Sequence, residues 1–276
     1  MDIAEALNYG VINLNNSESP ELDSQVLLCH TLVCASSYLH TWPEKELTTD
    51  QKADYIKLID LRQQGQPVAH LTGQRGFWSL DLKVTADTLI PRPDTELLVS
   101  LALEKLLANM TVVDLGTGSG AIGLSLAQED ASIKVFASDA SWPALAVAKH
   151  NADQHQLTNV SFWHGSWLAA IKANSIDMIV SNPPYIEADD AHLLVGDVRF
   201  EPMSALASGT DGLDDIRQII VQAKQCLKPA AWLLIEHGYH QAQQVMALFS
   251  EAGFTNIASH QDYGDNDRVV IGQQPL

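Results

Sequence analysis

The stretch of sequence that decides the fold is TVVDLGTGSG, at residues 111–120. Its first half is a short apolar run rich in β-branched residues, which is typical of a buried strand. Its second half alternates glycine with small residues, and glycine lets the backbone turn sharply and lets a ligand approach it closely. A helical pattern follows over residues 120–129. This strand–loop–helix unit predicts a ligand at the carboxyl edge of a parallel sheet.

Strand-like runs alternate with helical runs from this unit to the C-terminus. Strands are expected at 133–138, 160–164, 176–181, 231–236, 254–259 and 268–271, and helices at 141–151, 213–227 and 241–251. Such alternation gives a mostly parallel sheet with helices on both faces. We therefore predict an α/β, Rossmann-like domain over residues 91–276.

Residues 1–73 have a different pattern, without strand-like alternation. Apolar side chains recur at helical spacing in two runs, Ile3, Leu7, Val11 and Leu14 in the first, and Leu22, Val26, Leu27, His30 and Val33 on one side of the second. The capping residues 48–50 begin a third helix. We predict a small N-terminal helical bundle. The alternation at 76–84 predicts one strand, within a linker of residues 74–90.

Composition narrows the function classes. The 276 residues are 46% hydrophobic and 18% charged, which argues against disorder. The net charge of −18 argues against a protein that coats nucleic acid or binds an anionic membrane. The N-terminus is acidic, unlike a signal peptide, so a cytoplasmic enzyme is expected. Cys29, His30 and Cys34 lie in a helical run without a second ligand pair, so no metal site is expected.

The glycine loop predicts a cofactor that contains adenosine, but it does not distinguish NAD from S-adenosylmethionine. Gly118, Gly120 and Gly123 satisfy the dinucleotide fingerprint G-x-G-x-x-G. Asp139 comes 19 residues after Gly120, where an acid accepts hydrogen bonds from ribose hydroxyls. Both an NAD enzyme and an S-adenosylmethionine enzyme fit this segment.

A second motif, Asn182-Pro183-Pro184-Tyr185, favours S-adenosylmethionine. It follows the expected strand at 176–181, so it lies on the same edge of the sheet as the glycine loop. The prolines stiffen the loop, and the asparagine offers both an acceptor and a donor. The tyrosine offers a flat apolar face. Together these groups suit a planar NH2 group.

With both motifs in place, the chain resembles the class I S-adenosylmethionine-dependent amino-methyltransferases. Further segments resemble the bacterial peptide chain release factor glutamine methyltransferases, namely residues 67–73, 77–78, 89–96, 235–238 and 262–268. The chain departs from that family's usual pattern at His70 and at residues 74–76, both outside the reaction centre. The resemblance implies S-adenosylmethionine as cofactor. It also implies the glutamine of the Gly-Gly-Gln tip of class I release factors as substrate, and a release-factor docking role for the N-terminal bundle.

The site residues follow from the motifs and the resemblance together. The expected cofactor-binding residues are Gly116, Thr117, Gly118, Ser119, Gly120, Asp139, Trp167 and Asn182, with Trp167 beside the adenine by resemblance alone. The expected substrate-binding residues are Asn182, Pro183, Pro184 and Tyr185. Of these, Asn182, Pro183 and Tyr185 are expected to be catalytic, because they would orient the amide nitrogen toward the methyl group.

Three other functions compete with this interpretation. A nucleic-acid adenine-N6 methyltransferase uses the same Asn-Pro-Pro-Tyr motif on a flipped base, but the charge of −18 argues against direct nucleic-acid binding. An NAD-linked oxidoreductase leaves that motif unexplained. A cofactor-binding scaffold without activity is disfavoured because Asn182 is intact.

Overall fold

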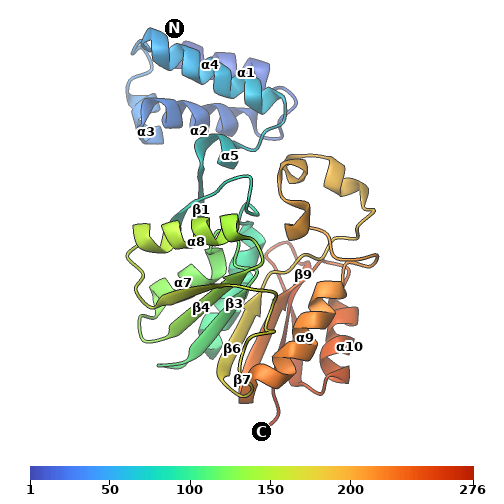
Figure 1. The fold of residues 1–276 in the computed structure, drawn as a ribbon. Helices are drawn as coiled ribbons and strands as arrows, with labels where there is room; N and C mark the ends of the chain where they lie inside the picture. Colours follow the sequence, from blue (N-terminus) through green and yellow to red (C-terminus); the bar gives the residue numbers. More distant parts are fainter. The chain divides into compact units, whose positions relative to one another are not determined.

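The computed structural model describes residues 1–276, which form two compact units (Figure 1). The first consists of Met1–Gln74 and Val195–Phe200, and the second of Arg75–Leu194 and Glu201–Leu276. None of the helices is long and apolar enough to cross a bilayer.

The first unit is a bundle of short helices. They are α1 (Ile3–Asn13), α2 (Pro20–Leu32), α3 (Ser36–Thr41), α4 (Thr49–Gln63) and α5 (Val68–Thr72). Asp2 and Thr48 each close a capping box, which fixes the first residues of α1 and α4. Glycine at position 10 lets α1 approach α2 closely, because a Cβ atom there would lie 2.3 Å from the Ser24 hydroxyl.

The apolar residues on one side of the second helical run do not form the buried face of α2. The buried residues of this helix are Asp23, Ser24, Leu27 and Leu28, whereas Leu22 and Val26 are exposed, as is Val33 just after the helix. Polar pairs explain the difference: the Ser24 hydroxyl lies 2.8 Å from that of Tyr55, and Arg62 Nε donates to Asp23 at 2.7 Å. Satisfied polar side chains therefore occupy positions that a hydrophobic pattern assigns to solvent.

The segment predicted as one strand at 76–84 contains two. Strands β1 (Gln74–Phe77) and β2 (Leu80–Lys83) form a small sheet of their own. The chain reverses at Trp78, which has a left-handed backbone with φ of 54° and donates its N–H to Glu96 at 2.9 Å. Apolar and polar residues continue to alternate through the turn, so hydrophobic periodicity does not reveal it.

The second unit contains a seven-stranded sheet in the order β5-β4-β3-β6-β7-β9-β8. Its strands are β3 (Thr111–Leu115), β4 (Lys134–Asp139), β5 (Val160–His164), β6 (Ile176–Ser181), β7 (Leu227–Glu236), β8 (Thr255–Gln261) and β9 (Asp267–Gln273). The first five are parallel, and β9 runs antiparallel to both β7 and β8. The predicted mostly parallel, Rossmann-like sheet is confirmed.

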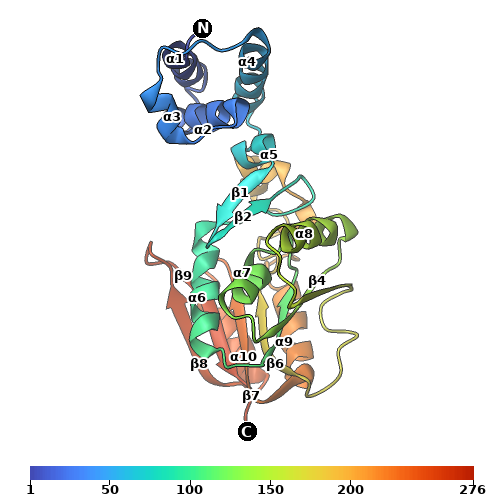
Figure 2. The ribbon, with the colours of Figure 1, turned by 90° about the vertical axis from the view of Figure 1, so that its left-hand side faces the viewer.

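Helices cover both faces of this sheet (Figures 1 and 2). One face carries α6 (Glu96–Lys105), α7 (Ala121–Glu129) and α8 (Trp142–Gln154), and the other carries α9 (Asp214–Cys226) and α10 (Ala242–Glu251). The short 3-10 helices are η1 (Pro93–Thr95), η2 (Ala191–Leu194), η3 (Asp197–Phe200) and η4 (Met203–Ala205).

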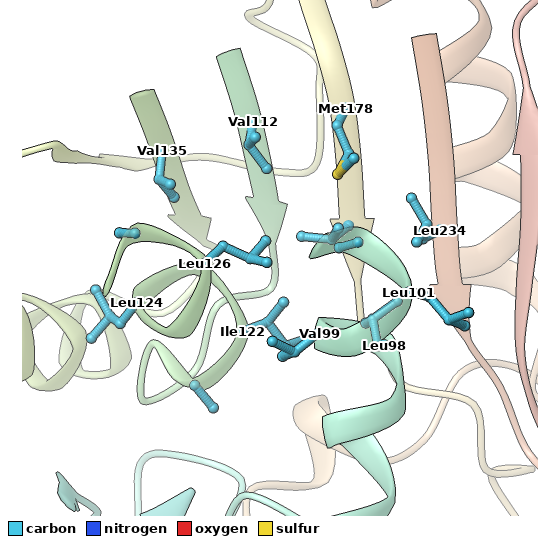
Figure 3. Close-up of a cluster of buried hydrophobic side chains, with 14 of the residues drawn as sticks. Leu98, Val99, Leu101, Val112, Ile122, Leu124, Leu126, Val135, Met178 and Leu234 are labelled. Atoms are coloured by element: carbon cyan, nitrogen blue, oxygen red, sulfur yellow. The ribbon is translucent and has the colours of Figure 1, made fainter. Parts of the chain in front are cut away.

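Each face has its own apolar core. In Figure 3, Leu98 and Leu101 of α6 and Ile122 of α7 lie below side chains such as Val112 and Met178 of the central strands, and all five are buried. This packing makes α6 and α7 rigid supports for the loops at the carboxyl ends of β3 and β6. Those loops flank the point where the strand order reverses, where open α/β sheets bind ligands.

Candidate active site

The glycine loop after β3 alternates open and buried positions. Gly116 and Gly118 are half-buried and have left-handed φ values of 67° and 56°. Thr117, Ser119 and Gly120 between and after them are buried. A Cβ atom at Gly118 would meet no other atom within 4 Å, so a side chain there would extend into open space. The loop therefore presents bare backbone to a ligand.

Asp114 in β3 fixes the shape of this loop, although it is not among the site residues expected from the sequence. Its Oδ2 accepts from the Thr117 hydroxyl at 2.6 Å and from Gly123 N at 2.9 Å. The side chain is fully buried, and Oδ1 has no hydrogen-bond partner. Burial raises the pKa of this carboxyl from 3.8 to about 6, against the lowering effect of the two hydrogen bonds.

Asp139 is the last residue of β4, and its carboxylate accepts hydrogen bonds from the glycine loop and from the loop after β4. Its Oδ2 accepts from Gly118 N at 3.0 Å, and its Oδ1 accepts from Ser141 N at 2.8 Å. Each carboxylate oxygen keeps lone pairs for a further donor. The same side chain thus fixes the glycine loop and offers acceptors beside it.

Trp167 lies in the loop after β5, and its indole ring packs against Gly116 of the glycine loop. A Cβ atom on Gly116 would lie 3.4 Å from the indole ring, and the indole N–H donates to Asp215 at 3.1 Å. The tryptophan backbone is left-handed, with φ of 45°. A bulky residue in this conformation stores strain, which marks functional sites more often than plain cores.

The Asn-Pro-Pro-Tyr loop after β6 is held by buried partners. Asn182 Nδ2 donates to the Thr95 hydroxyl at 3.2 Å, and Asn182 Oδ1 makes no hydrogen bond within the chain. Tyr185 N donates to Leu206 O at 3.1 Å, and the Tyr185 hydroxyl lies 3.4 Å from Glu236 Oε1. Burial raises the pKa of the Tyr185 hydroxyl, and the nearby Glu236 charge adds to that rise. Tyr185 is therefore neutral at physiological pH.

Glu236 ends β7 beside this loop and is 1% exposed. Burial raises the pKa of its carboxyl from 4.5 to about 7, while hydrogen bonding from Thr95 and the charge of Arg268 oppose the rise. Arg268 is in turn held by Asp262 at 3.1 Å and Asp94 at 3.3 Å. Glu236 and Thr95 are not among the site residues expected from the sequence. Both lie in the segments that carry the family resemblance, and that resemblance is their only signal.

One cavity of about 500 Å³ connects these loops. Its lining comes from the carboxyl ends of four strands, from residues 86–89, from Pro202, Ser204 and Ala205, and from Asp215 and Gln218 of α9. Of the expected site residues, the lining includes Gly116, Gly118, Asp139, Trp167, Asn182 and Pro184. Thr117, Ser119, Gly120, Pro183 and Tyr185 are not part of the lining; the first four are buried behind it, and Tyr185 is half-buried.

The cavity fits a bound S-adenosylmethionine. Its volume lies in the range of small-ligand pockets, about 300–1,000 Å³. Bare glycine backbone, a carboxylate with spare acceptors and an indole face line it together. These groups match the polar methionine end, the ribose hydroxyls and the flat adenine of that cofactor.

The sheet order, the glycine loop and the Asn-Pro-Pro-Tyr loop together define a class I S-adenosylmethionine-dependent methyltransferase. The Methyltransferase small domain family matches residues 93–205, and the PrmC N-terminal domain family matches residues 5–73. The chain is 46% identical to the release factor glutamine methyltransferase of Shewanella oneidensis over 273 residues, 98% of this chain and 96% of that protein. It belongs to the release factor glutamine methyltransferase family.

One further relative supports the family, and one solved structure supports the fold. The release factor glutamine methyltransferase of Aliivibrio fischeri is 45% identical over 264 residues, 95% of this chain and 93% of that protein. The crystal structure of ribosomal protein L11 methylase from Lactobacillus delbrueckii subsp. bulgaricus matches with a TM-score of 0.50 at 21% identity, over 66% of this chain and 80% of that one. At that identity, the structural match bears on the fold alone.

Proposed function

We propose that this enzyme transfers a methyl group to the side-chain amide nitrogen, N5, of the glutamine in the Gly-Gly-Gln motif of class I peptide chain release factors. The observation that carries the proposal is that Asn182 and Pro184 line the same cavity as Gly118 and Asp139. An amide-reading loop therefore adjoins a cofactor-type pocket. The release-factor substrate follows from family membership.

The chemical difficulty lies in the nitrogen of the acceptor. The lone pair of an amide nitrogen is delocalised into its carbonyl, so the nitrogen is a weak nucleophile. Bound S-adenosylmethionine supplies a sulfonium-activated methyl group. The chain's own task is then to orient the amide and to exclude competing geometries.

We assign that task to the Asn-Pro-Pro-Tyr loop. The Asn182 Oδ1 atom and the Pro183 carbonyl accept the two amide hydrogens, which turns the nitrogen lone pair toward the methyl group. Tyr185 packs against the amide plane, and Pro184 shapes the loop. The product's extra proton leaves after transfer, so no strong general base is required.

The cofactor roles are proposed in the same way. Residues 116–120 hold the methionine and ribose end by their backbone. Asp139 accepts from the ribose hydroxyls, and Trp167 lies beside the adenine. We further propose that the bundle of residues 1–73 docks the release factor, that residues 74–90 link it to the catalytic domain of residues 91–276, and that the enzyme acts in the cytoplasm, where translation terminates.

The test uses an unmethylated release factor, S-adenosylmethionine and peptide mass spectrometry. The wild-type enzyme is expected to add one methyl group to the Gly-Gly-Gln glutamine. Asn182→Ala is expected to lose most of this transfer while it still binds the cofactor in calorimetry. Gln128→Ala, an exposed amide side chain at the end of α7, is the matched control and should keep full activity. Full activity in Asn182→Ala, or methylation elsewhere in the release factor, would contradict the proposal.

A further inference from the structure

Behind the Asn-Pro-Pro-Tyr loop lies a short chain of hydrogen-bonding side chains that the proposed mechanism leaves unused. Asn182 Nδ2 donates to the Thr95 hydroxyl at 3.2 Å. Thr95 also lies beside Glu236, where its hydroxyl lowers the pKa of that carboxyl. The Tyr185 hydroxyl lies 3.4 Å from Glu236 Oε1, and Glu236 Oε2 has no hydrogen-bond partner. Thr95 is 3% exposed and Glu236 is 1% exposed, so water does not compete for these contacts.

The donors and acceptors on these side chains determine the direction of the hydrogen bonds between them. A carboxylate only accepts hydrogen bonds, whereas a hydroxyl has one hydrogen to donate and lone pairs to accept with. Thr95 lies beside a carboxylate that offers only lone pairs and whose Oε2 has no other partner, so its single hydrogen is attracted toward Glu236. The Thr95 oxygen then stays an acceptor for Asn182, as its 3.2 Å contact with Nδ2 requires. An acceptor at that point must face the NH2 group of Asn182 rather than its carbonyl oxygen. The Oδ1 atom is then left for the cavity.

We infer that Thr95 and Glu236 are positioning residues that fix the orientation of the Asn182 amide, so that the site reads an NH2 donor. This inference rests on the proposed function, in which the acceptor is a primary amide. An asparagine amide has nearly the same shape when it is rotated by half a turn. Rotated in that way, Asn182 would present NH2 to the substrate's NH2, and two donors do not bond. The shape of the site does not prevent this rotation of the Asn182 amide, so the direction of its hydrogen bond to Thr95 must prevent it.

Glu236 also couples the second recognition residue to the first, because it contacts the Tyr185 hydroxyl as well as Thr95. The charged and titratable groups that face Glu236 are Arg268 from β9, Asp94 from η1 and Tyr185 from the loop after β6. Burial brings the pKa of Glu236 to about 7. Below that pH the carboxyl carries a hydrogen of its own, and the direction of the Thr95 hydrogen is no longer imposed. Turnover by the wild type is therefore expected to fall as the pH drops below about 7.

The experiment compares Thr95→Val with Thr95→Ser in the full-length enzyme. Valine has the shape of threonine without the acceptor, and serine restores the hydroxyl. Thr95→Val should lower kcat by about 10- to 100-fold, the loss expected when a hydrogen bond that orients a reacting group is removed. Its affinity for S-adenosylmethionine by calorimetry should stay at the wild-type value, and Thr95→Ser should recover most of kcat. Thr255→Val, at the exposed start of β8, is the matched control.

A second readout does not depend on turnover. With ¹⁵N-labelled asparagine, the side-chain NH2 resonances of Asn182, assigned from Asn182→Asp, should be protected from hydrogen exchange in the wild type and in Thr95→Ser. They should lose that protection in Thr95→Val. If Thr95→Val does not fold, Glu236→Gln takes its place, and it should lower kcat and flatten the pH profile near pH 7.

Wild-type kcat and unchanged NH2 protection in Thr95→Val would overturn the inference, as would a Thr95→Ser variant as slow as Thr95→Val. Failure of the wild type to methylate the release factor would instead refute the proposed function. The NH2 measurement would then still decide whether Thr95 and Glu236 orient Asn182.

Discussion

Replacing Asp114 with asparagine should remove a pH-dependent cost that this carboxyl imposes on the fold. The side chain is fully buried, only its Oδ2 is hydrogen-bonded, and its pKa is raised from 3.8 to about 6. Ionisation in the folded state therefore costs about 3 kcal/mol more than in the unfolded chain, at about 1.4 kcal/mol for each tenfold change in acidity.

The sign follows from proton binding. Between about pH 4 and pH 6 the folded state holds more protons at this site than the unfolded state. The contribution of Asp114 to the free energy of unfolding therefore falls as the pH rises through this window, and it is constant above it. An asparagine at this position has no proton to lose. In the Asp114→Asn variant, the amide oxygen can accept both hydrogen bonds that Oδ2 accepts now, and the unpartnered NH2 adds a penalty that does not depend on pH.

The assay is urea denaturation followed by circular dichroism at several pH values. The free energy of unfolding of Asp114→Asn minus that of the wild type should rise by about 2 kcal/mol from pH 4 to pH 7, because part of the total is already lost at pH 4. The difference between the two proteins cancels the contributions of other buried acids, Glu236 among them. Asp130→Asn is the control of opposite sign, because hydrogen bonds from Ser132 lower the pKa of that exposed carboxyl, and its difference should fall with rising pH below pH 4. Parallel stability curves for Asp114→Asn and the wild type would refute the reasoning.

Two other substitutions test separate parts of the molecule. Asp139→Ala should weaken cofactor binding at least about 10-fold, because it removes the acceptors that fix Gly118 N–H and Ser141 N–H along with those offered to the ribose; calorimetry with S-adenosylhomocysteine checks this, and unchanged affinity would count against the role. Gly10→Ala should lower the free energy of unfolding by about 1–3 kcal/mol, since the new methyl group would lie 2.3 Å from the Ser24 hydroxyl. Thermal denaturation measures the second effect, and a melting temperature equal to that of the wild type would show that the bundle accommodates the methyl group.

The cavity-lining residues of the candidate site could be predicted from the sequence because each loop has a local signature. The loop at 116–120 needs glycines for its left-handed backbone, and the loop at 182–185 contains two prolines. Each follows a buried strand, and the carboxyl ends of parallel strands share one edge of the sheet. Chain order and turn chemistry were therefore sufficient to bring these residues together.

The errors in the fold have a different origin. Apolar spacing does not predict the buried face of α2, because the buried Ser24 and Asp23 hydrogen-bond to Tyr55 and Arg62 inside the bundle. The alternation at 76–84 predicts one strand rather than the hairpin at 74–83, because a left-handed Trp78 reverses the chain without the glycine or asparagine that usually marks such a turn. Both errors concern contacts or backbone angles that residue type alone does not determine.

The supporting residues were missed for a related reason. Thr95 and Asn182 are 87 positions apart, and Tyr185 and Glu236 are 51 apart. They meet only because β7 pairs with β6 and η1 begins the helix that packs over both strands. Single threonines and glutamates carry no motif of their own, so their role becomes visible only once the strand order is known.

Buried carboxyls with raised pKa values occupy two of the strand ends that border the site, Asp114 on β3 and Glu236 on β7. A fold selected for stability alone would replace such groups with apolar side chains, because an ionised carboxyl away from water is unfavourable. Each instead accepts hydrogen bonds at a recognition loop: Asp114 from Thr117 and from Gly123 in the helix that follows, and Glu236 from the Tyr185 hydroxyl. Methyl transfer to an amide depends on the orientation of the reacting groups more than on acid–base chemistry. In an enzyme for that reaction, fixed hydrogen-bond directions around the site can therefore outweigh the stability that a buried carboxyl costs. Under the proposed mechanism, these buried acids act through the loops that they hold and do not touch the substrate.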